Sequence, residues 1–306
     1  MPANREFNIR HDLWNEIEVP SFPEIPTMIS DQERRYLYWL AKEFYTGEGR
    51  IVEAGTWLGG SSACLAAGLH DAGSREILHC YDNYVWMKAY ESRAGGIILP
   101  EGGDFQPKFK QLIYGRFSNV KSTKAQLSEV VWSGGPIEVL FLDAPKNKAD
   151  MILAIKAFFP SLIPGFSIVV FQDFLYSPAY EVPATVCAID DVLTLVHTVE
   201  NSSTAAFRVN KDLIMRTGVE ADYEAIPLNT IVNKMSQLMV TLPQQAGDFL
   251  AVSLAFLVHD RRSVREAIEI IHQRKLGVIG KRRLKFLGSM GHVRRKYAQL
   301  FIGVGV

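Results

Sequence analysis

Residues 51–62 read I-V-E-A-G-T-W-L-G-G-S-S, and this stretch decides the fold of the chain. A short apolar run ends on Glu53, and a glycine-bearing turn follows from Gly55 to Gly60. The next residues, S-S-A-C-L-A-A-G-L, are compatible with a helix. A strand, a Gly-rich turn and a helix in this order cradle nucleotide-like ligands in open α/β sheets. Glycines let the backbone approach the ligand, and the helix N-terminus offers unpaired N–H groups.

Strand-like segments alternate with helical ones from residue 51 to residue 175. The segment 166–171, F-S-I-V-V-F, is almost wholly apolar, as expected for the buried centre of a parallel sheet. The alternation predicts an α/β fold with a doubly wound, mostly parallel sheet, and an antiparallel strand pair is expected at one edge, at 193–199 and 204–209. Ligands of such sheets bind beyond the carboxyl ends of the strands. The predicted strands end there on Glu53, Asp82, Asp143 and Gln172-Asp173.

We predict three segments along the chain. Residues 1–48 form an irregular arm and a helix, at whose start Ser30 and Glu33 make a capping box. Residues 49–222 hold the sheet and its ligand site. Residues 223–306 read as a helical extension, which is basic from about residue 259.

Two stretches between the strands are harder to assign. Residues 83–118 hold Gly95-Gly96 and Gly102-Gly103 among several aromatic residues and read as irregular, which is typical of a lid or a mobile loop. Residues 126–132 read as a helix.

Composition restricts the class of protein. With 48% hydrophobic and 22% charged residues, the chain has the make-up of an ordinary globular protein. The N-terminal sequence M-P-A-N-R-E-F is too polar for a signal peptide, and the longest apolar runs are too short for a membrane helix. The three cysteines, at positions 64, 80 and 187, show no metal-binding spacing. We therefore expect a cytoplasmic protein with no membrane partner.

Charge is unevenly distributed although the formal net charge is zero. Residues 259–296 carry twelve Lys or Arg against three acidic residues, a balance of +9, so the remaining 21 basic and 30 acidic residues balance at −9. This split indicates that the tail meets something acidic, either its own molecule or a second copy. We expect a homo-oligomer through the C-terminal helices. Nucleic acid is disfavoured because few aromatic residues interleave with the basic ones.

The turn after the first strand does not fit a dinucleotide fingerprint. G-x-G-x-x-G is missing, and bulky Trp57 lies within the turn, which disfavours NAD or FAD. E-A-G-T-W-L-G-G-S instead resembles the first motif of class I S-adenosylmethionine-dependent methyltransferases, and C-Y-D-N at 80–83 resembles their ribose-binding acid. The resemblance covers roughly residues 30–210. It implies that S-adenosylmethionine is the cofactor and that the residues holding it are Glu53, Gly55, Thr56, Gly59, Ser61, Asp82, Gln126 and Asp143.

Two further motifs narrow the resemblance. L-F-L-D-A-P-K at 140–146 and F-Q-D-F at 171–174 resemble the catechol O-methyltransferase-like and macrocin-type sugar O-methyltransferases. In that group the first Asp binds a divalent cation, an acidic or Asn pair after the next strand completes the site, and a Lys is the general base. The resemblance implies Asp143 and Lys146 as catalytic residues and a Mg²⁺ site formed by Asp143, Gln172 and Asp173.

Gln172 departs from the group, which usually has Asp or Glu at this position. Mg²⁺ prefers carboxylate and water oxygens, so an amide removes a unit of charge that the ion needs. A working metal site and an empty one, with Gln172 bonded to substrate or backbone, both remain open. Lys146 likewise reads either as a general base, which must be neutral to act, or as a surface lysine.

The predicted reaction is the transfer of a methyl group to a hydroxyl of a small molecule, namely a sugar, a nucleotide-sugar or a natural product. Two alternatives from other classes remain. One is a catalytically silent cofactor-binding protein whose helical tail builds an assembly. The other is a nicotinamide-dependent oxidoreductase, which the glycine spacing disfavours.

Overall fold

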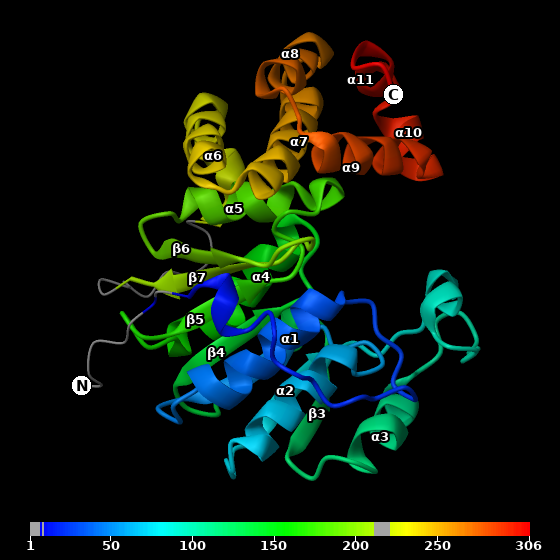
Figure 1. Ribbon diagram of the computed structural model, residues 1–306, viewed down its shortest axis with the longest axis vertical. Coiled ribbons are helices and arrows are strands. Elements are labelled where there is room, and N and C mark those ends of the chain that lie inside the picture. Colours follow the sequence, from blue (N-terminus) through cyan, green and yellow to red (C-terminus); the bar gives the residue numbers. More distant parts are fainter. Residues whose placement is uncertain (1–6, 8, 211–220) are drawn as a thin grey trace. The chain divides into compact units, whose positions relative to one another are not determined.

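The computed structural model describes residues 7, 9–210 and 221–306. A seven-stranded sheet of order β3-β2-β1-β4-β5-β7-β6 forms its centre (Figure 1). The first five strands are parallel, and β7 runs antiparallel to both β5 and β6. The predicted doubly wound sheet with an antiparallel strand at its edge is confirmed. The strands are β1 (Arg50–Ala54), β2 (Leu78–Asp82), β3 (Val120–Lys124), β4 (Ile137–Leu142), β5 (Ile168–Phe171), β6 (Leu193–Thr198) and β7 (Ala205–Val209).

The register of the sheet brings the carboxyl ends of β1, β2, β4 and β5, where the site residues were predicted, to the same end of the sheet. Glu53 of β1 lies beside Cys80 of β2 and Phe141 of β4, and Leu142 lies beside Phe171 of β5. The strand order reverses between β1 and β4, and ligands of open α/β sheets bind at such a switch point. The residues that follow these strands therefore meet where a ligand is expected.

The chain folds into two compact units. The first consists of Met1–Pro145, Leu153–Gln172 and Asp191–Thr217, and the second of Lys146–Ile152, Asp173–Asp190 and Gly218–Val306. All seven strands belong to the first unit. The chain therefore passes from one unit to the other directly after β4 and again directly after β5.

In the first unit, helices cover one face of the sheet through a buried apolar cluster. The cluster joins α1 (Asp31–Trp39) and α2 (Gly60–Asp71) to residues such as Ile51 and Val139 of the strands. The predicted capping box begins α1, because Ser30 Oγ accepts from the Glu33 N–H at 3.2 Å and Glu33 Oε2 accepts from the Ser30 N–H at 2.7 Å. A five-residue π-helical turn, Leu40–Phe44, follows α1.

Two of the local predictions are wrong. The segment 83–118 contains a short 3-10 helix, Lys88–Arg93, and the helix α3 (Gln106–Tyr114). Phe109 and Ile113, one turn apart, are buried and fix α3, whereas the glycines before it favoured an irregular segment. Residues 126–132 form only the 3-10 turn Leu127–Glu129, because the Trp132 indole donates to the Gly135 carbonyl at 2.7 Å and its ring contacts His79 and Tyr81.

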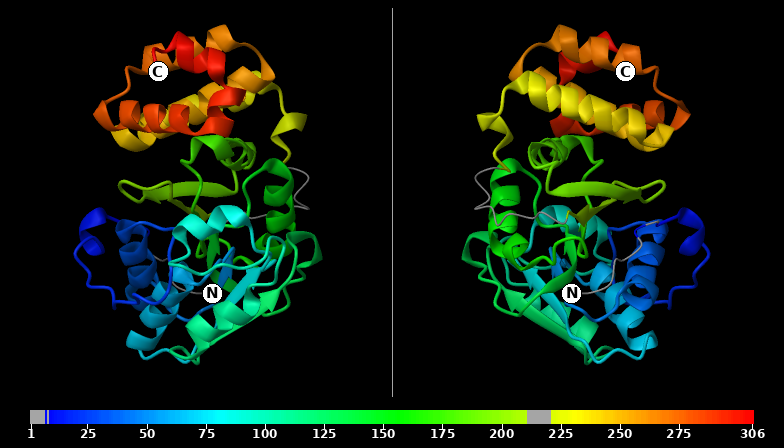
Figure 2. Two further views of the ribbon diagram at one scale, coloured as in Figure 1. Left: turned by 90° about the vertical axis from the view of Figure 1, so that its right-hand side faces the viewer. Right: turned by 90° about the vertical axis from the view of Figure 1, so that its left-hand side faces the viewer.

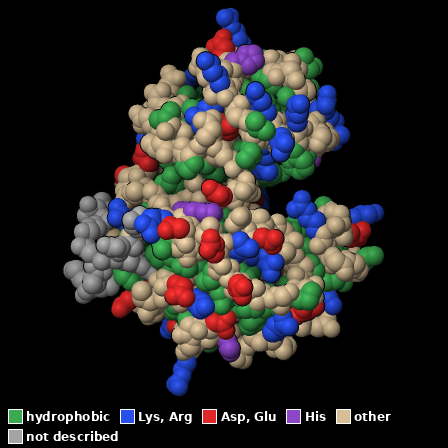
Figure 3. Space-filling model, in the orientation of Figure 1, with side chains coloured by type: hydrophobic (Ala, Val, Ile, Leu, Met, Phe, Trp, Pro, Cys, Tyr) green, Lys and Arg blue, Asp and Glu red, His purple; other side chains and the backbone are tan. Residues whose placement is uncertain are grey.

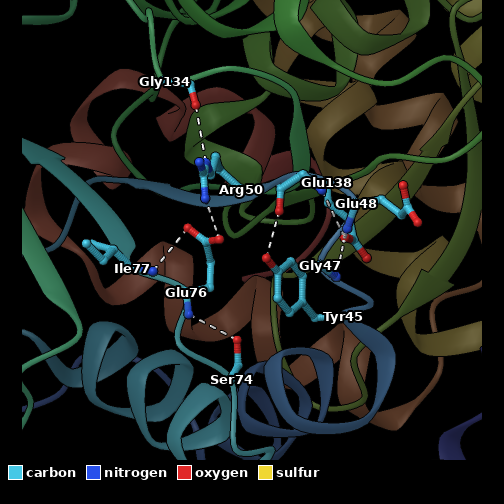
Figure 4. A network of polar contacts seen from close by, with 10 residues as sticks. Tyr45, Gly47, Glu48, Arg50, Ser74, Glu76, Ile77, Gly134 and Glu138 are labelled. Carbon is cyan, nitrogen blue, oxygen red and sulfur yellow. Dashed lines mark hydrogen bonds and ion pairs between the residues drawn. The ribbon is translucent and has the colours of Figure 1, made fainter.

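At the amino ends of the strands, the buried carboxylate of Glu138 binds the turn that precedes β1 (Figure 4). Glu138 of β4 accepts from the N–H groups of Thr46, Gly47, Glu48 and Gly49 at 2.7–3.4 Å. The Thr46 hydroxyl adds a fifth donor at 3.1 Å. Nearby in the same view, Arg50 binds the Glu76 carboxylate at 2.5 Å.

We predict that Glu138→Gln lowers the free energy of unfolding by about 2 kcal/mol. The amide keeps one acceptor oxygen and turns an N–H₂ group toward backbone donors, which leaves buried N–H groups unsatisfied. Urea unfolding of both proteins measures the change. Glu48→Gln, on an exposed side chain of the same turn, is the matched control and should leave stability unaltered. Equal stability of Glu138→Gln and wild type would contradict the prediction.

The second unit is helical, with α7 (Gln244–Arg261) at its centre. Residues 246–258 of α7 are all buried, and α6, α8 and α9 contact this helix. Figure 2 shows the helices after residue 227 in yellow to red. No helix among the described residues is long and apolar enough to cross a membrane. The helices of this unit are α5 (Glu181–Ala188), α6 (Leu228–Thr241), α7, α8 (Val264–Arg274), α9 (Val278–Ser289), α10 (Gly291–Lys296) and α11 (Ala298–Gly303).

Candidate active site

The Gly-rich turn lies against the end of β4. Gly55 has a φ of +93°, and a Cβ on it would lie 2.5 Å from the Ala144 nitrogen and 2.7 Å from the Asp143 carbonyl carbon. The N–H groups of Asp143 and Ala144 both donate to the Ala54 carbonyl at 2.8 Å. Only glycine combines this conformation with this close approach. The turn thus brings the predicted cofactor residues Gly55 and Asp143 together.

Asp82, at the end of β2, holds the same turn from its other side. Its Oδ2 accepts from the N–H groups of Thr56 at 2.8 Å and Trp57 at 3.1 Å, and its Oδ1 accepts from the Tyr84 N–H at 2.7 Å. Burial raises the pKa of Asp82, and these three hydrogen bonds oppose that rise. A carboxylate fixed in this way has lone pairs left for a ligand, since two oxygens offer about four acceptor sites.

Glu53 is fully buried beneath the turn. Its carboxyl group accepts from the hydroxyls of Ser61 and Ser62 in the first turn of α2 and, at 3.3 Å, from the thiol of Cys80. Burial raises the pKa of Glu53 from 4.5 to about 7. Because the side chain is fully buried, Glu53 fixes the start of α2 from inside the protein. The N-cap residue of α2 is Gly59, which has no side chain to accept from the first N–H groups of the helix.

We predict a pH-dependent stability from Glu53. Because its pKa is raised on folding, the protonated form contributes stability that is complete below pH 4.5 and is lost as the pH rises to about 7. The free energy of unfolding falls by roughly 3 kcal/mol over this range. Glu53→Gln keeps the shape without the ionisation, so its free energy of unfolding relative to wild type should rise between pH 4.5 and about pH 7 and level off above. Denaturant unfolding across this range measures it, and parallel curves for the two proteins would be inconsistent with a buried titrating Glu53.

An aromatic cluster adjoins the turn. Trp57 has a φ of +45° and contacts Tyr90 edge-on with ring centroids 5.9 Å apart. Tyr90 in turn contacts Trp86 and Phe105, from the segment expected to be irregular. The buried indole N–H of Trp57 has no acceptor within the described residues. In the sequence, Trp57 is only a bulky residue that argues against a dinucleotide, and its unbonded indole donor becomes visible in the structure.

Gln126 follows β3 at the same edge of the sheet. The preceding residue, Ala125, donates its N–H to the Asp82 carbonyl at 2.9 Å, which ties the end of β3 to the end of β2. The exposed Gln126 begins the 3-10 turn Leu127–Glu129, and its N–H donates to the Glu129 carboxylate at 3.0 Å. The predicted contact of Gln126 with the cofactor stays a prediction.

Gln172 ends β5 and is bound to a buried carboxylate that the sequence analysis did not connect with it. Its Nε2 donates to Glu33 Oε1 at 3.3 Å. The hydroxyl of Thr204, at the start of β7, donates to the same oxygen at 2.6 Å. A carboxylate at position 172 would face the Glu33 carboxylate, which explains the amide here. Glu33 gave no signal beyond its capping box, because its partners lie 139 and 171 residues away in sequence.

Lys146 and Asp173 lie in the second unit and form an ion pair between Nζ and Oδ2. The Lys146 side chain is 46% exposed and that of Asp173 is 13% exposed. Asp143 and Gln172, with which Asp173 was expected to bind a metal, are counted with the first unit.

The donor groups present do not fit a Mg²⁺ site. The Gln172 amide nitrogen is turned to Glu33, and Asp173 already has the ammonium of Lys146 as its cation. Across residues 7, 9–210 and 221–306, no three His, Cys, Asp or Glu residues group as a metal site. The predicted set itself has only two carboxylates beside the Gln172 amide. We therefore derive no step of a reaction through a metal.

Residues 52–174 match the family model described as a methyltransferase domain. Among solved structures, the O-methyltransferase NovP is 13% identical with a TM-score of 0.48, over 60% of this chain and 82% of that chain. The methyltransferase PaMTH1 of Podospora anserina, bound to S-adenosylhomocysteine, is 13% identical with a TM-score of 0.42, over 60% and 80%. The calicheamicin methyltransferase CalS11 is 16% identical with a TM-score of 0.42, over 57% and 76%. No curated protein matches the chain.

Proposed function

Residues 52–174 form a class I, S-adenosylmethionine-dependent methyltransferase domain, and from this premise we propose that the protein transfers a methyl group to a hydroxyl of a small molecule. The observation that supports this most is the position of Asp82. Its carboxylate lies at the end of β2 and holds the backbone of the Gly-rich turn, where a ribose diol can bind the remaining lone pairs.

Cofactor binding is assigned to the turn and the strand ends around it. Asp82 accepts from the ribose hydroxyls, and the N–H groups at the start of α2 receive the carboxylate of the methionine part. Glu53 positions that start by holding the Ser61 and Ser62 hydroxyls. S-adenosylmethionine supplies an electrophilic methyl group when bound. The set proposed to hold it is Gly55, Thr56, Gly59, Ser61, Asp82, Gln126 and Asp143, with Glu53 acting from beneath.

Lys146 is the proposed general base. It follows β4 three residues after Asp143, so one strand end leads to both residues. As a neutral amine, Lys146 would take the proton from the acceptor hydroxyl while the oxygen attacks the methyl group. For this, its amine has to leave the ion pair with Asp173. General-base help is typically worth about 10²–10⁴-fold, and alignment of the acceptor oxygen with the methyl group contributes through orientation.

A methyl-transfer assay tests the proposal. Purified protein is incubated with S-adenosylmethionine carrying a labelled methyl group and a panel of sugars, nucleotide-sugars and phenols, with and without EDTA. We expect label in a hydroxyl acceptor and equal rates in EDTA, because Gln172 leaves the predicted Mg²⁺ set with only two carboxylates, Asp143 and Asp173. Loss of the rate in EDTA and its recovery with Mg²⁺ would instead show that a metal binds. Absence of transfer to every acceptor, with cofactor binding intact, would favour a catalytically silent cofactor-binding protein.

A further inference from the structure

The last helices of the second unit carry cations that lack counter-charges. After Glu269 the sequence holds nine Lys or Arg and no Asp or Glu. Two of the nine are neutralised within the unit, since Arg274 binds Asp248 at 2.9 Å and Lys296 binds Asp260 at 2.7 Å. The exposed ones that form no ion pair with any described residue are Lys275, Lys281, Arg282, Lys285, Arg294 and Arg295. Such a field attracts anionic partners.

Helix α9 packs on the unit by one face only. The buried residues of this helix are Gly280, Leu284, Leu287 and Gly288. A Cβ on Gly280 would lie 2.6 Å from Asp248 Oδ2, so α9 lies close against α7. A Cβ on Gly288 would lie 3.0 Å from the Val306 side chain, so the end of the chain packs on the same helix. The residues on the other side of α9 are therefore left to solvent or to a partner.

The outer side of α9 combines apolar and basic side chains. Its exposed large apolar residues are Val278 at 68%, Ile279 at 42% and Phe286 at 51%. Ile279 and Phe286 are seven residues apart and therefore lie on the same side of the helix. Lys281 and Lys285 lie four residues apart along the neighbouring side, with Arg282 between the two rows. We call these six residues the α9 face. Exposed apolar groups rimmed by charged ones are typical of an interaction site.

A partner of the α9 face has to offer negative charge and apolar groups together. Figure 3 shows Lys and Arg side chains gathered over the C-terminal helices, with apolar side chains between them. A two-fold contact with a second copy would set these cations against the same cations, which repel them. The phosphates of a nucleic acid would pair the cations but leave the apolar side chains in water. The surface of an anionic lipid bilayer satisfies both, since headgroups pair the cations and the acyl boundary takes the apolar groups.

We propose that the α9 face binds the surface of a membrane that contains anionic lipids. Helix α9 lies along the bilayer plane, with Phe286 and Ile279 at the boundary between headgroups and acyl chains and the basic row against lipid phosphates. The expectation of no membrane partner rested on the lack of a segment long enough to span a bilayer, and a surface contact needs no such segment. The contact is independent of methyl transfer, because it uses none of the residues proposed to hold the cofactor or to act as base.

Cosedimentation of the full chain with sucrose-loaded vesicles tests the proposal. One set of vesicles contains phosphatidylglycerol and phosphatidylcholine in equal parts, and the other contains phosphatidylcholine alone. We expect binding to the first set only, and its loss at about 1 M salt, where the Debye length is about 3 Å. Replacing Lys281, Arg282 and Lys285 together by Gln should weaken binding about 100-fold, since each cation near an anionic surface contributes about fivefold.

Phe286→Ser separates insertion from simple charge attraction. It leaves every charge in place and should still weaken binding to the anionic vesicles about tenfold, because the ring no longer enters the acyl boundary. Two matched controls lie on other helices of the same unit. Val240→Ser removes an apolar side chain of α6 that is 70% exposed, and Arg265→Gln removes an exposed cation of α8 that pairs with Glu269. Both should bind within about twofold of wild type.

Three results would overturn the proposal. They are the absence of binding to anionic vesicles, equal binding to both sets of vesicles, and binding of Phe286→Ser as tight as that of wild type. Sedimentation equilibrium without lipid adds a fourth, since a dimer that the triple Gln variant converts to monomer would show that a second copy covers the α9 face. S-adenosylhomocysteine affinity is measured separately and should be the same in the triple variant, so the vesicle result and the methyltransferase function can fail independently.

Discussion

Lys146→Ala is expected to lower kcat for the methylated acceptor by about 10²–10⁴-fold while S-adenosylhomocysteine binds as tightly as to wild type. Without the amine, the acceptor hydroxyl must lose its proton to water as its oxygen attacks. Cofactor affinity is spared because the cofactor residues lie on the turn after β1 and at the end of β2. Steady-state rates with labelled S-adenosylmethionine and calorimetry with S-adenosylhomocysteine measure the two quantities separately.

Lys148→Ala is the control for this variant. Lys148 lies two residues on and is paired with Asp222 and Glu224, so it is not placed to accept a proton from substrate. Its kcat should stay close to that of wild type. An undiminished kcat in Lys146→Ala would remove Lys146 from the mechanism and leave it the role of an ion-pair partner to Asp173.

Asp82→Asn is expected to weaken S-adenosylhomocysteine binding about 100-fold, since hydrogen bonds to charged groups are worth about 1.5–3 kcal/mol each. The amide cannot accept both from the ribose and from the N–H groups of Thr56 and Trp57, and its own N–H₂ opposes those donors. The variant therefore loses a ligand contact and loosens the turn at once. Calorimetry gives the affinity directly.

The matched control is Asp104→Asn. Asp104 is an exposed acid of the same unit that binds Lys124 at 2.7 Å and accepts from the Gln106 N–H at 2.8 Å. Its substitution should leave cofactor affinity within about threefold of wild type, because the residue lies outside the cofactor turn. If Asp82→Asn bound S-adenosylhomocysteine as tightly as this control, Asp82 would be a structural residue of the turn and not a ribose ligand.

The sheet could be predicted from sequence because each strand is encoded locally. The apolar run at 166–171 contains β5, which lies between β4 and β7 in the sheet. Helix α3 was missed because its buried face consists of only Phe109 and Ile113, preceded by a glycine pair. Tertiary contacts of Trp132, and not local propensity, prevent a helix at 126–132.

Some residues of the candidate site could likewise be placed from sequence, and others could not. Residues at strand ends, such as Asp82 and Asp143, could be placed by topology, because parallel strands deliver their ends to one edge. The hydrogen bond between Gln172 and Glu33 could not be predicted, because it joins the end of β5 to α1 across 139 residues. That contact also explains the departure from the expected metal ligands.

Titration of the wild-type protein with S-adenosylhomocysteine and, separately, with NADH tests the central claim most directly. The account predicts saturable binding of S-adenosylhomocysteine, one molecule per chain, with the same affinity in EDTA, and no heat from NADH. Binding of NADH, or no binding of S-adenosylhomocysteine at millimolar concentration, would contradict it.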